Sequence, residues 1–376
     1  MFNLSLKKIF PFVFIYSFIL FSHNCLAFNE EIISAKGIIL EVETITKSAE
    51  EADLRMNDSI LSDYYEEQKL KVKILSNRDK GKIVNIINDL NQNPFDIKIK
   101  KGDKVFLYGN SINGEMKYYV RDFWHLDSLI FWITLFFILV ILLGKSQGLK
   151  SLLTLVISLF IIFAIYIPLI LKGVNPIQVA ILISLAVSCL TLPIIHGFSL
   201  KAAISIIGTV GGIFVASFFS FLVSYFSHLN GLGTEDMRLF AASNSDLNFR
   251  GILFSGIIIG ALGAIMDVAV SISSGLQEIK QHKPTICFKE LVISGMNIGK
   301  DIMGSMLNTL IFAYIGTSIA VVLIISQNKT GIMEFLNYDF VAEEIIRSIV
   351  GSIGLLAAIP ITAITAGLMH KLITKK

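Results

Sequence analysis

The chain has 376 residues, of which 54% are hydrophobic and 28 are phenylalanine, and its formal net charge is +3. Together with a strongly positive mean hydropathy, this composition excludes an ordinary soluble protein and indicates a membrane protein whose first partner is the lipid bilayer. The net charge is too small to support nucleic-acid binding, so no nucleic-acid partner is expected.

The N-terminal segment, residues 1–27, has the pattern of a secretory signal peptide. Lys7 and Lys8 precede an apolar run over residues 9–21, and a small-residue cleavage site ends at Ala27. Cleavage after Ala27 is the main prediction. An uncleaved anchor helix over the same residues is the alternative.

Residues 28–125 are predicted to form a small exported β-barrel or sandwich domain of five or six strands. The stretch KLKVKIL, residues 69–75, alternates lysines with apolar residues, and NRDKG, residues 77–81, supplies the turn of a hairpin before GKIVNII. KGIILEVE, FDIKIKKGDKVFLYG and MKYYVRDF add further strands. The charged segment 47–67 interrupts the pattern, so we expect a loop or a short exposed helix there. The lysines of residues 69–75 are interpreted as a solvated face, with binding to an anionic lipid or polymer as the alternative.

Residues 126–376 are predicted to form an α-helical polytopic membrane domain. Seven apolar runs are long enough to span a bilayer, near residues 126–144, 151–171, 177–195, 203–226, 251–276, 305–326 and 345–368. If the β domain lies outside, the inner loops and the C-terminal tail hold ten lysines, whereas the outer loops hold five basic and seven acidic residues. The positive-inside rule therefore gives the same orientation as the exported domain, N-out and C-in.

The fifth run carries an aspartate in the middle of a spanning segment. An acidic side chain at that depth costs about 2.5 to 3.5 kcal/mol on insertion scales, so its surroundings must offset that cost. Small and polar residues recur around it at intervals of three or four and share one helical face, namely Gly260, Gly263, Asp267, Ser271, Ser274 and Glu278. We expect this face to point into the bundle interior or a hydrated cavity rather than toward lipid.

The segment that leads into the sixth run repeats this pattern. Asp301, Ser305 and Asn308 share a face, and Lys300 lies beside them. We expect the two polar faces to meet, with Lys300 as the counter-ion of Asp267 or Glu278 unless Asp301 pairs with it. The candidate residues for binding a substrate or ion are therefore Asp267, Ser271, Ser274, Glu278, Lys300, Asp301, Ser305 and Asn308.

Two interpretations of these residues stay open. They either join helices through hydrogen bonds, with Asp267 protonated because burial disfavours its charged form, or they form a carboxylate site that exchanges a proton or binds an ion inside a cavity. The second interpretation gains support because Asp267 is accompanied by a whole polar stripe.

Five stretches of the chain form recognisable motifs. Two of them hold the polar faces, GALGAIMDVAVSISSGLQEI and SGMNIGKDIMGSMLNTLIFAYIGTS, and the others are HGFSLKAAISIIGTVGG, RSIVGSIGLLAAIPITA and KVKILSNRDKGKIVNIIND. Together they resemble the YibE/F family of bacterial multi-spanning membrane proteins, over most of the chain. The resemblance implies the same topology in a bacterial plasma (inner) membrane, and it implies no particular substrate or activity.

No enzyme motif accompanies these residues. The sequence has no G-x-S-x-G elbow, P-loop or H-E-x-x-H motif, and Asp301 is predicted at a different depth from Asp267, unlike the close pair of an aspartic protease. The six histidines are scattered, and none pairs at metal-ligand spacing. We therefore expect no enzyme activity, no metal and no cofactor.

Two classes of function remain. The first is a secondary transporter or channel for a small solute or ion, with Asp267 as the titrating or ion-binding group. The second is a non-transporting, membrane-anchored sensor or docking module, in which the extracytoplasmic β domain binds a protein partner.

Overall fold

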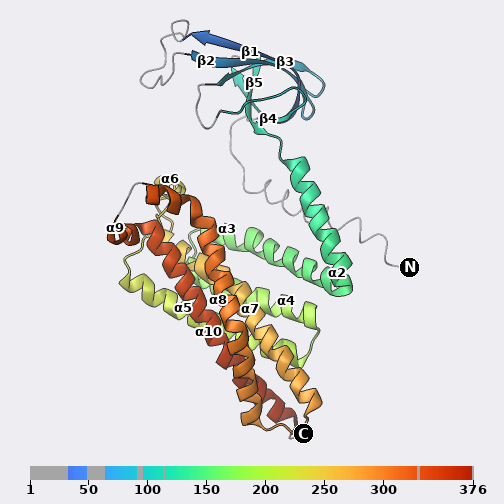
Figure 1. Cartoon of the computed structure of the whole chain (residues 1–376), viewed down its shortest axis with the longest axis vertical. Helices are drawn as coiled ribbons and strands as arrows, with labels where there is room; N and C mark the ends of the chain where they lie inside the picture. The colour runs from blue at the N-terminus through green and yellow to red at the C-terminus, as the bar shows by residue number, and fades with distance from the viewer. Residues whose placement is uncertain (1–32, 49–63, 91–95, 113–114, 328–330, 375–376) are drawn as a thin grey trace, which may run out of the picture. The chain divides into compact units, whose positions relative to one another are not determined.

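The computed structural model describes residues 33–48, 64–90, 96–112, 115–327 and 331–374 (Figure 1). The predicted signal peptide lies outside these ranges, as does most of the charged segment 47–67. The described residues form two compact units, one up to Leu139 and the other from Val140 onward.

Five antiparallel strands form the first unit, in the order β3-β2-β1-β4-β5. They are β1 (Ile33–Ser48), β2 (Tyr64–Ile74), β3 (Ile83–Leu90), β4 (Lys104–Ile112) and β5 (Glu115–Phe123). The sheet curls into a half-barrel (Figure 1). This arrangement confirms the predicted small β domain.

The alternation of residues 69–75 builds the core of this sheet. Leu70, Val72 and Ile74 are at most 2% exposed, whereas Lys69 and Lys73 are exposed on the other face of β2. Side chains alternate between faces along a strand, so the apolar set points inward as the sequence predicts.

The five strands agree with the predicted five or six, but the strand predicted in FDIKIKKGDKVFLYG, residues 95–109, is shorter than expected. Residues 96–103 have no strand pairing, and β4 begins only at Lys104. The side-chain amide of Gln68 donates to the carbonyl oxygen of Ile99 at 3.1 Å and accepts from the Ile99 amide nitrogen at 3.0 Å. These two bonds replace a strand partner for Ile99, which is 1% exposed. Alternation alone could not distinguish this buried loop from a strand.

The second unit is helical, and the first helix of the chain begins before it. The helices are α2 (Leu126–Ile161), α3 (Ile167–Leu171), α4 (Pro176–His196), α5 (Leu200–Phe226), α6 (Glu235–Ser243), α7 (Phe249–His282), α8 (Phe288–Gln327), α9 (Ile332–Asn337) and α10 (Asp339–Thr374). A π-helical turn, Ile162–Tyr166, joins α2 to α3. Within the described residues, six helical segments are long and apolar enough to cross a membrane. The predicted class, an α-helical polytopic membrane protein with a β domain, is therefore confirmed.

The first of these six segments, Leu126–Leu171, is 46 residues long, and about 20 residues suffice for one crossing. Its helix breaks at Lys145, where φ is 47° and ψ is −126°. The chain turns so sharply there that a Cβ atom at Gly148 would overlap the carbonyl oxygen of Val140. The two parts correspond to the predicted runs 126–144 and 151–171, but a single residue breaks the helix where a loop was expected.

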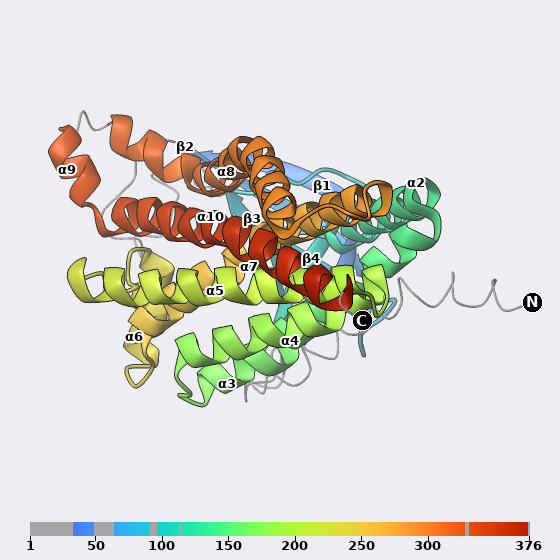
Figure 2. The same ribbon diagram turned by 90° about the horizontal axis from the view of Figure 1, so that it is seen from below.

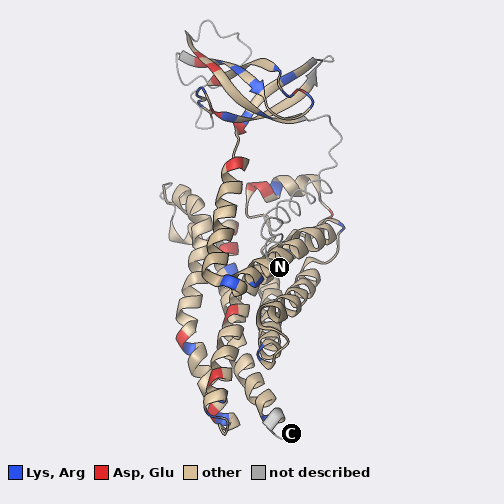
Figure 3. Cartoon of the chain, turned by 90° about the vertical axis from the view of Figure 1, so that its right-hand side faces the viewer, with Lys and Arg blue, Asp and Glu red and all other residues tan. Residues whose placement is uncertain are grey.

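α7 is the central helix of the second unit, and it contacts α4, α5, α8 and α10. α10 lies between α5 and α8 (Figure 2). Gly212 of α5 permits the close approach of α5 and α10, because its Cα faces the backbone of Gly354. Few charged residues interrupt these helices (Figure 3).

Candidate functional site

The two faces of α7 have opposite surroundings. Ile265, Val268 and Ile272 are 0% exposed and pack against the neighbouring helices. Asp267 and Ser271 lie on the opposite face and are exposed. The apolar face therefore provides the helix packing, and the other described residues leave the polar face uncovered.

The predicted stripe is one continuous face of α7, as its spacing indicated. Gly260, Gly263 and Glu278 are exposed along with the two polar residues above, and Ser274 is half-buried. A Cβ atom at Gly263 would meet no atom within 4 Å. The structure thus differs from the expectation that the chain's own helices would enclose this face.

α8 runs beside α7, and two contacts fix how the helices align. Gly260 lies against the hydroxyl of Tyr314, and Gly275 lies against Ile298. Asp267 is midway between the two contact points on α7, and Ser305 is close to the midpoint on α8. These two residues therefore lie at about the same depth along the helix pair.

The second predicted face lies on α8 and is also uncovered. Lys300, Asp301, Ser305 and Asn308 are all exposed. α8 begins at Phe288, well before the predicted run 305–326, so all four residues belong to the helix itself. The alignment of the two helices brings the four α8 residues to the depths occupied by the polar residues of α7.

The hydrogen bonds of these residues show which groups remain available. Ser274 Oγ donates to the carbonyl oxygen of Val270 at 2.6 Å, and Ser305 Oγ donates to that of Ile302 at 2.9 Å. Each hydroxyl proton is thus used within its own helix, and the oxygen lone pairs are free to accept a bond or bind a cation.

The predicted counter-ion is not in place. Glu278 pairs with His282 at 3.0 Å. In the part of the chain that the structure describes, Lys300 forms no ion pair with Asp267, Asp301 or Glu278. Asp267 is therefore a carboxyl group on an open helix face, and no described lysine or arginine pairs with it. No group of three potential metal ligands occurs among the described residues.

A second polar cluster, which the sequence analysis missed, lies at the other end of α8. Glu344 of α10 pairs with Arg347 at 3.4 Å, and the Arg347 guanidinium lies 5.9 Å from the centre of the Tyr314 ring. Glu343, beside them in sequence, is only 6% exposed. The sequence did contain a signal for this cluster, because two acidic residues are followed by an arginine three positions after the second. The sequence analysis interpreted these residues only as charges of an outer loop.

The polar atoms of this cluster are incompletely paired. Tyr314 Oη, Glu343 Oε1, Glu344 Oε2 and Arg347 Nε are buried and have no hydrogen-bond partner among the described residues. Buried polar groups in folded proteins are nearly always satisfied by protein or ordered water. We therefore expect water molecules at this cluster. Tyr314 connects it to Gly260, the first residue of the polar stripe on α7.

A half-barrel β domain and several helices long and apolar enough to cross a membrane define an integral membrane protein with an attached β domain. Family models match nearly the whole chain, the N-terminal domain of the YibE/F family over residues 34–123 and the YibE/F-like protein over residues 132–372. The chain therefore belongs to the YibE/F family. No curated protein and no solved structure matches the chain.

Proposed function

We propose that the protein is a secondary transporter or channel in a bacterial plasma (inner) membrane, and that an ion or small solute passes along the polar face shared by α7 and α8. The observation that carries this proposal is the uncovered position of Asp267 halfway along α7. In lipid, such a carboxyl group costs about 2.5 to 3.5 kcal/mol. Water, a bound cation or a proton offsets this cost, and a conduction pathway supplies each of them.

Polar groups continue from Asp267 toward both ends of the helices. This continuity supports a conduction pathway rather than a single structural hydrogen bond at Asp267. On one side lie Tyr314 and the Glu344–Arg347 pair. On the other side lie Ser271, Ser274 and Glu278 of α7, with Asp301 and Lys300 of α8. Asp267 is the coupling residue in this proposal, and the oxygen atoms of Ser271, Ser305 and Asn308 complete the binding site.

The proposal includes the cellular setting inferred from the sequence. Residues 1–27 act as the export signal, residues 28–125 lie outside the cytoplasm, and the C-terminus lies inside. The chemistry is passage without covalent change, so the protein acts neither as an enzyme nor with a cofactor.

Ion flux into liposomes tests the proposal. Purified wild-type protein and the Asp267→Asn variant are reconstituted, and internal pH and membrane potential are followed under imposed proton and sodium gradients. We expect flux with the wild type and its loss in Asp267→Asn, with unchanged elution on size exclusion. Asp246→Asn is the matched control, because Asp246 is exposed and, among the described residues, its side chain accepts a hydrogen bond only from the adjacent Ser245. Equal flux through wild type and Asp267→Asn would overturn the role of Asp267.

A second candidate function is favoured by the outer face of the β domain. Ile83 and Ile87 of β3 are 53% and 59% exposed, and they pair across the sheet with Lys73 and Lys69. An apolar and basic surface of this kind fits docking to a protein partner in a non-transporting sensor. In that case Ile83→Ser with Ile87→Ser removes function, and Asp267→Asn preserves it.

A further inference from the structure

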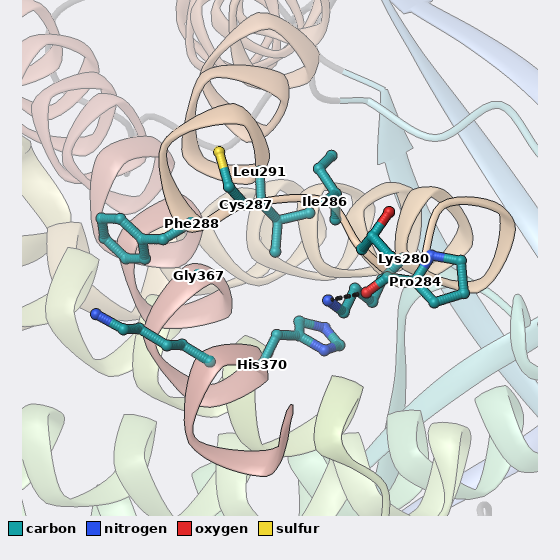
Figure 4. A pocket seen from close by; sticks show the side chains of 10 residues that line it. Lys280, Pro284, Ile286, Cys287, Phe288, Leu291, Gly367 and His370 are labelled. Atoms are coloured by element: carbon teal, nitrogen blue, oxygen red, sulfur yellow. Dashed lines mark hydrogen bonds between the residues drawn. The ribbon is translucent and has the colours of Figure 1, made fainter. Parts of the chain in front are cut away.

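The ends of α7, α8 and α10 enclose a pocket of about 240 Å³ (Figure 4). It is lined by side chains from the last turn of α7, the connection to α8 and the last turns of α10. The positive-inside rule assigns this end of the helices to the cytoplasm. Its lining residue Lys280 lies two residues after Glu278, the last residue of the polar stripe on α7.

The charge of the pocket is positive. Lys280 and Lys371 line it, and none of its described lining residues is acidic. Lys280 Nζ donates to the carbonyl oxygen of Pro284 at 2.6 Å, a neutral partner that leaves the ammonium charge uncompensated (Figure 4).

The acidic residues nearby are paired elsewhere. Glu290 binds Lys283 at 2.9 Å, and Glu278 binds His282 at 3.0 Å. The positive groups of the pocket thus keep their charge available for a ligand. α8 begins at Phe288, beside the pocket, and the unpaired amide groups of its first turn add to the positive potential.

The walls of the pocket are apolar and limit its size. Leu291 is 1% exposed and Ile286 is 9% exposed. The absence of a side chain at Gly367 lets the ring of Phe288 lie against the backbone of α10. The volume is below the roughly 300 to 1,000 Å³ of sites for drug-sized ligands, so it suits a compact anionic group.

We propose that this pocket binds a phosphate group, held by Lys280 and Lys371. Basic pockets between membrane helices on the cytoplasmic side bind the head groups of anionic lipids. The same chemistry would serve a soluble phosphate, and the two sources are separable by experiment.

Cys287 provides the readout, because its exposed thiol lines the pocket. Cys25→Ser and Cys189→Ser leave it as the single thiol of the full chain. The rate at which a maleimide labels Cys287 is measured in detergent under four conditions. The additive is dioctanoyl phosphatidylglycerol, dioctanoyl phosphatidylcholine, inorganic phosphate, or chloride at the same ionic strength. Slower labelling with phosphatidylglycerol alone identifies a lipid head group, and equal protection by inorganic phosphate identifies a soluble anion.

Lysine variants test the assignment of the residues. The double variant Lys280→Gln with Lys371→Gln should lower the affinity for the protecting ligand about 25-fold, which is about five-fold for each lysine. Lys289→Gln is the matched control, since Lys289 is exposed at the same helix end but does not line the pocket. The proposal is overturned if neither phosphate-bearing anion slows labelling more than phosphatidylcholine or chloride does. It is also overturned if the double variant, eluting as the wild type does, keeps the wild-type affinity.

Discussion

The hydroxyl of Tyr314 on α8 lies so close to Gly260 on α7 that a Cβ atom at Gly260 would come within 2.8 Å of it. This contact joins the polar stripe of α7 to the cluster of Glu344 and Arg347. Among the described residues in these contacts, Tyr314 alone touches both the polar stripe of α7 and the Glu344–Arg347 cluster. Its position therefore determines whether polar groups continue from the stripe to the cluster.

Gly260→Leu should therefore reduce flux. The leucine side chain would displace the Tyr314 hydroxyl and place an apolar group in the polar stripe. Liposome flux measures the effect. Gly256→Leu is the control, because a Cβ atom at Gly256 meets no atom within 4 Å. Equal loss of flux in both variants would contradict a specific role for the contact with Tyr314.

Gly212→Ala should destabilise the helix bundle. A Cβ atom there would lie 2.7 Å from Cγ2 of Ile265 and 2.9 Å from the carbonyl oxygen of Gly354. Overpacking of this kind typically costs about 1 to 3 kcal/mol, and thermal unfolding in detergent measures it. Gly256→Ala, which adds the same methyl group in open space, should be neutral or stabilising by up to about 1 kcal/mol. A melting temperature of Gly212→Ala at or above that of the wild type would contradict the tight contact.

The sequence predicted which residues share a face more reliably than what covers that face. The stripe from Gly260 to Glu278 follows from helical spacing, and the structure places its members together. Its exposure depends on which side of α7 the other helices occupy, and that is decided by how well Ile265, Val268 and Ile272 pack. Helical periodicity does not say which helix packs against a given face. It therefore identified the residues of the polar face but not the residues that surround it.

Single-residue features and long-range side-chain bonds were also beyond the sequence pattern. The helix break at Lys145 involves one residue with positive φ, and hydropathy indicated only that two spans meet near it. The bonds from Gln68 to Ile99 join residues 31 positions apart. In contrast, Leu70, Val72 and Ile74 were predictable because local alternation determines their orientation on β2.

The stability of the β domain should depend on pH through Asp79 and Tyr118. Tyr118 Oη donates to Asp79 Oδ2 at 2.6 Å. Burial, reinforced by this bond, raises the pKa of Tyr118 to about 12. Hydrogen bonds from Lys82 and then Tyr118 lower the pKa of the Asp79 carboxyl below its ordinary value.

These shifts have opposite signs, so the two residues stabilise the folded state only between acid and alkaline limits. The Asp79 contribution is lost as the pH falls through and below its ordinary pKa of 3.8. The Tyr118 contribution is complete below pH 10 and is lost as the pH rises toward 12.

Tyr118→Phe isolates this pair. At neutral pH it should lower the stability of the domain by about 1 kcal/mol, the typical net value of a hydrogen bond. The difference in melting temperature between wild type and Tyr118→Phe should shrink toward both pH limits. Tyr119→Phe is the control, since Tyr119 is exposed. A difference that stays constant from pH 3 to pH 11 would show that the hydrogen bond to Asp79 does not cause it.

Arg347→Gln should destabilise the packing of the first turns of α10 against α8. It removes the guanidinium that lies 3.4 Å from Glu344 and over the ring of Tyr314. Glu344 then remains as a largely buried charge without its partner, which costs about 1 to 3 kcal/mol. Arg347→Lys should recover only part of the loss, because an ammonium group lacks the planar surface that stacks on an aromatic ring.

The double variant Arg347→Gln with Glu344→Gln separates charge pairing from packing. It should be more stable than Arg347→Gln alone, because neither side chain then carries an unpaired charge. Arg238→Gln serves as the control, since Arg238 is exposed and its side chain donates a hydrogen bond to the backbone carbonyl oxygen of Leu232. Thermal unfolding of the wild type, Arg347→Gln, Glu344→Gln and the double variant in detergent gives the coupling energy between Glu344 and Arg347. A coupling energy near zero would mean that Arg347 stabilises the protein through its contact with Tyr314 alone.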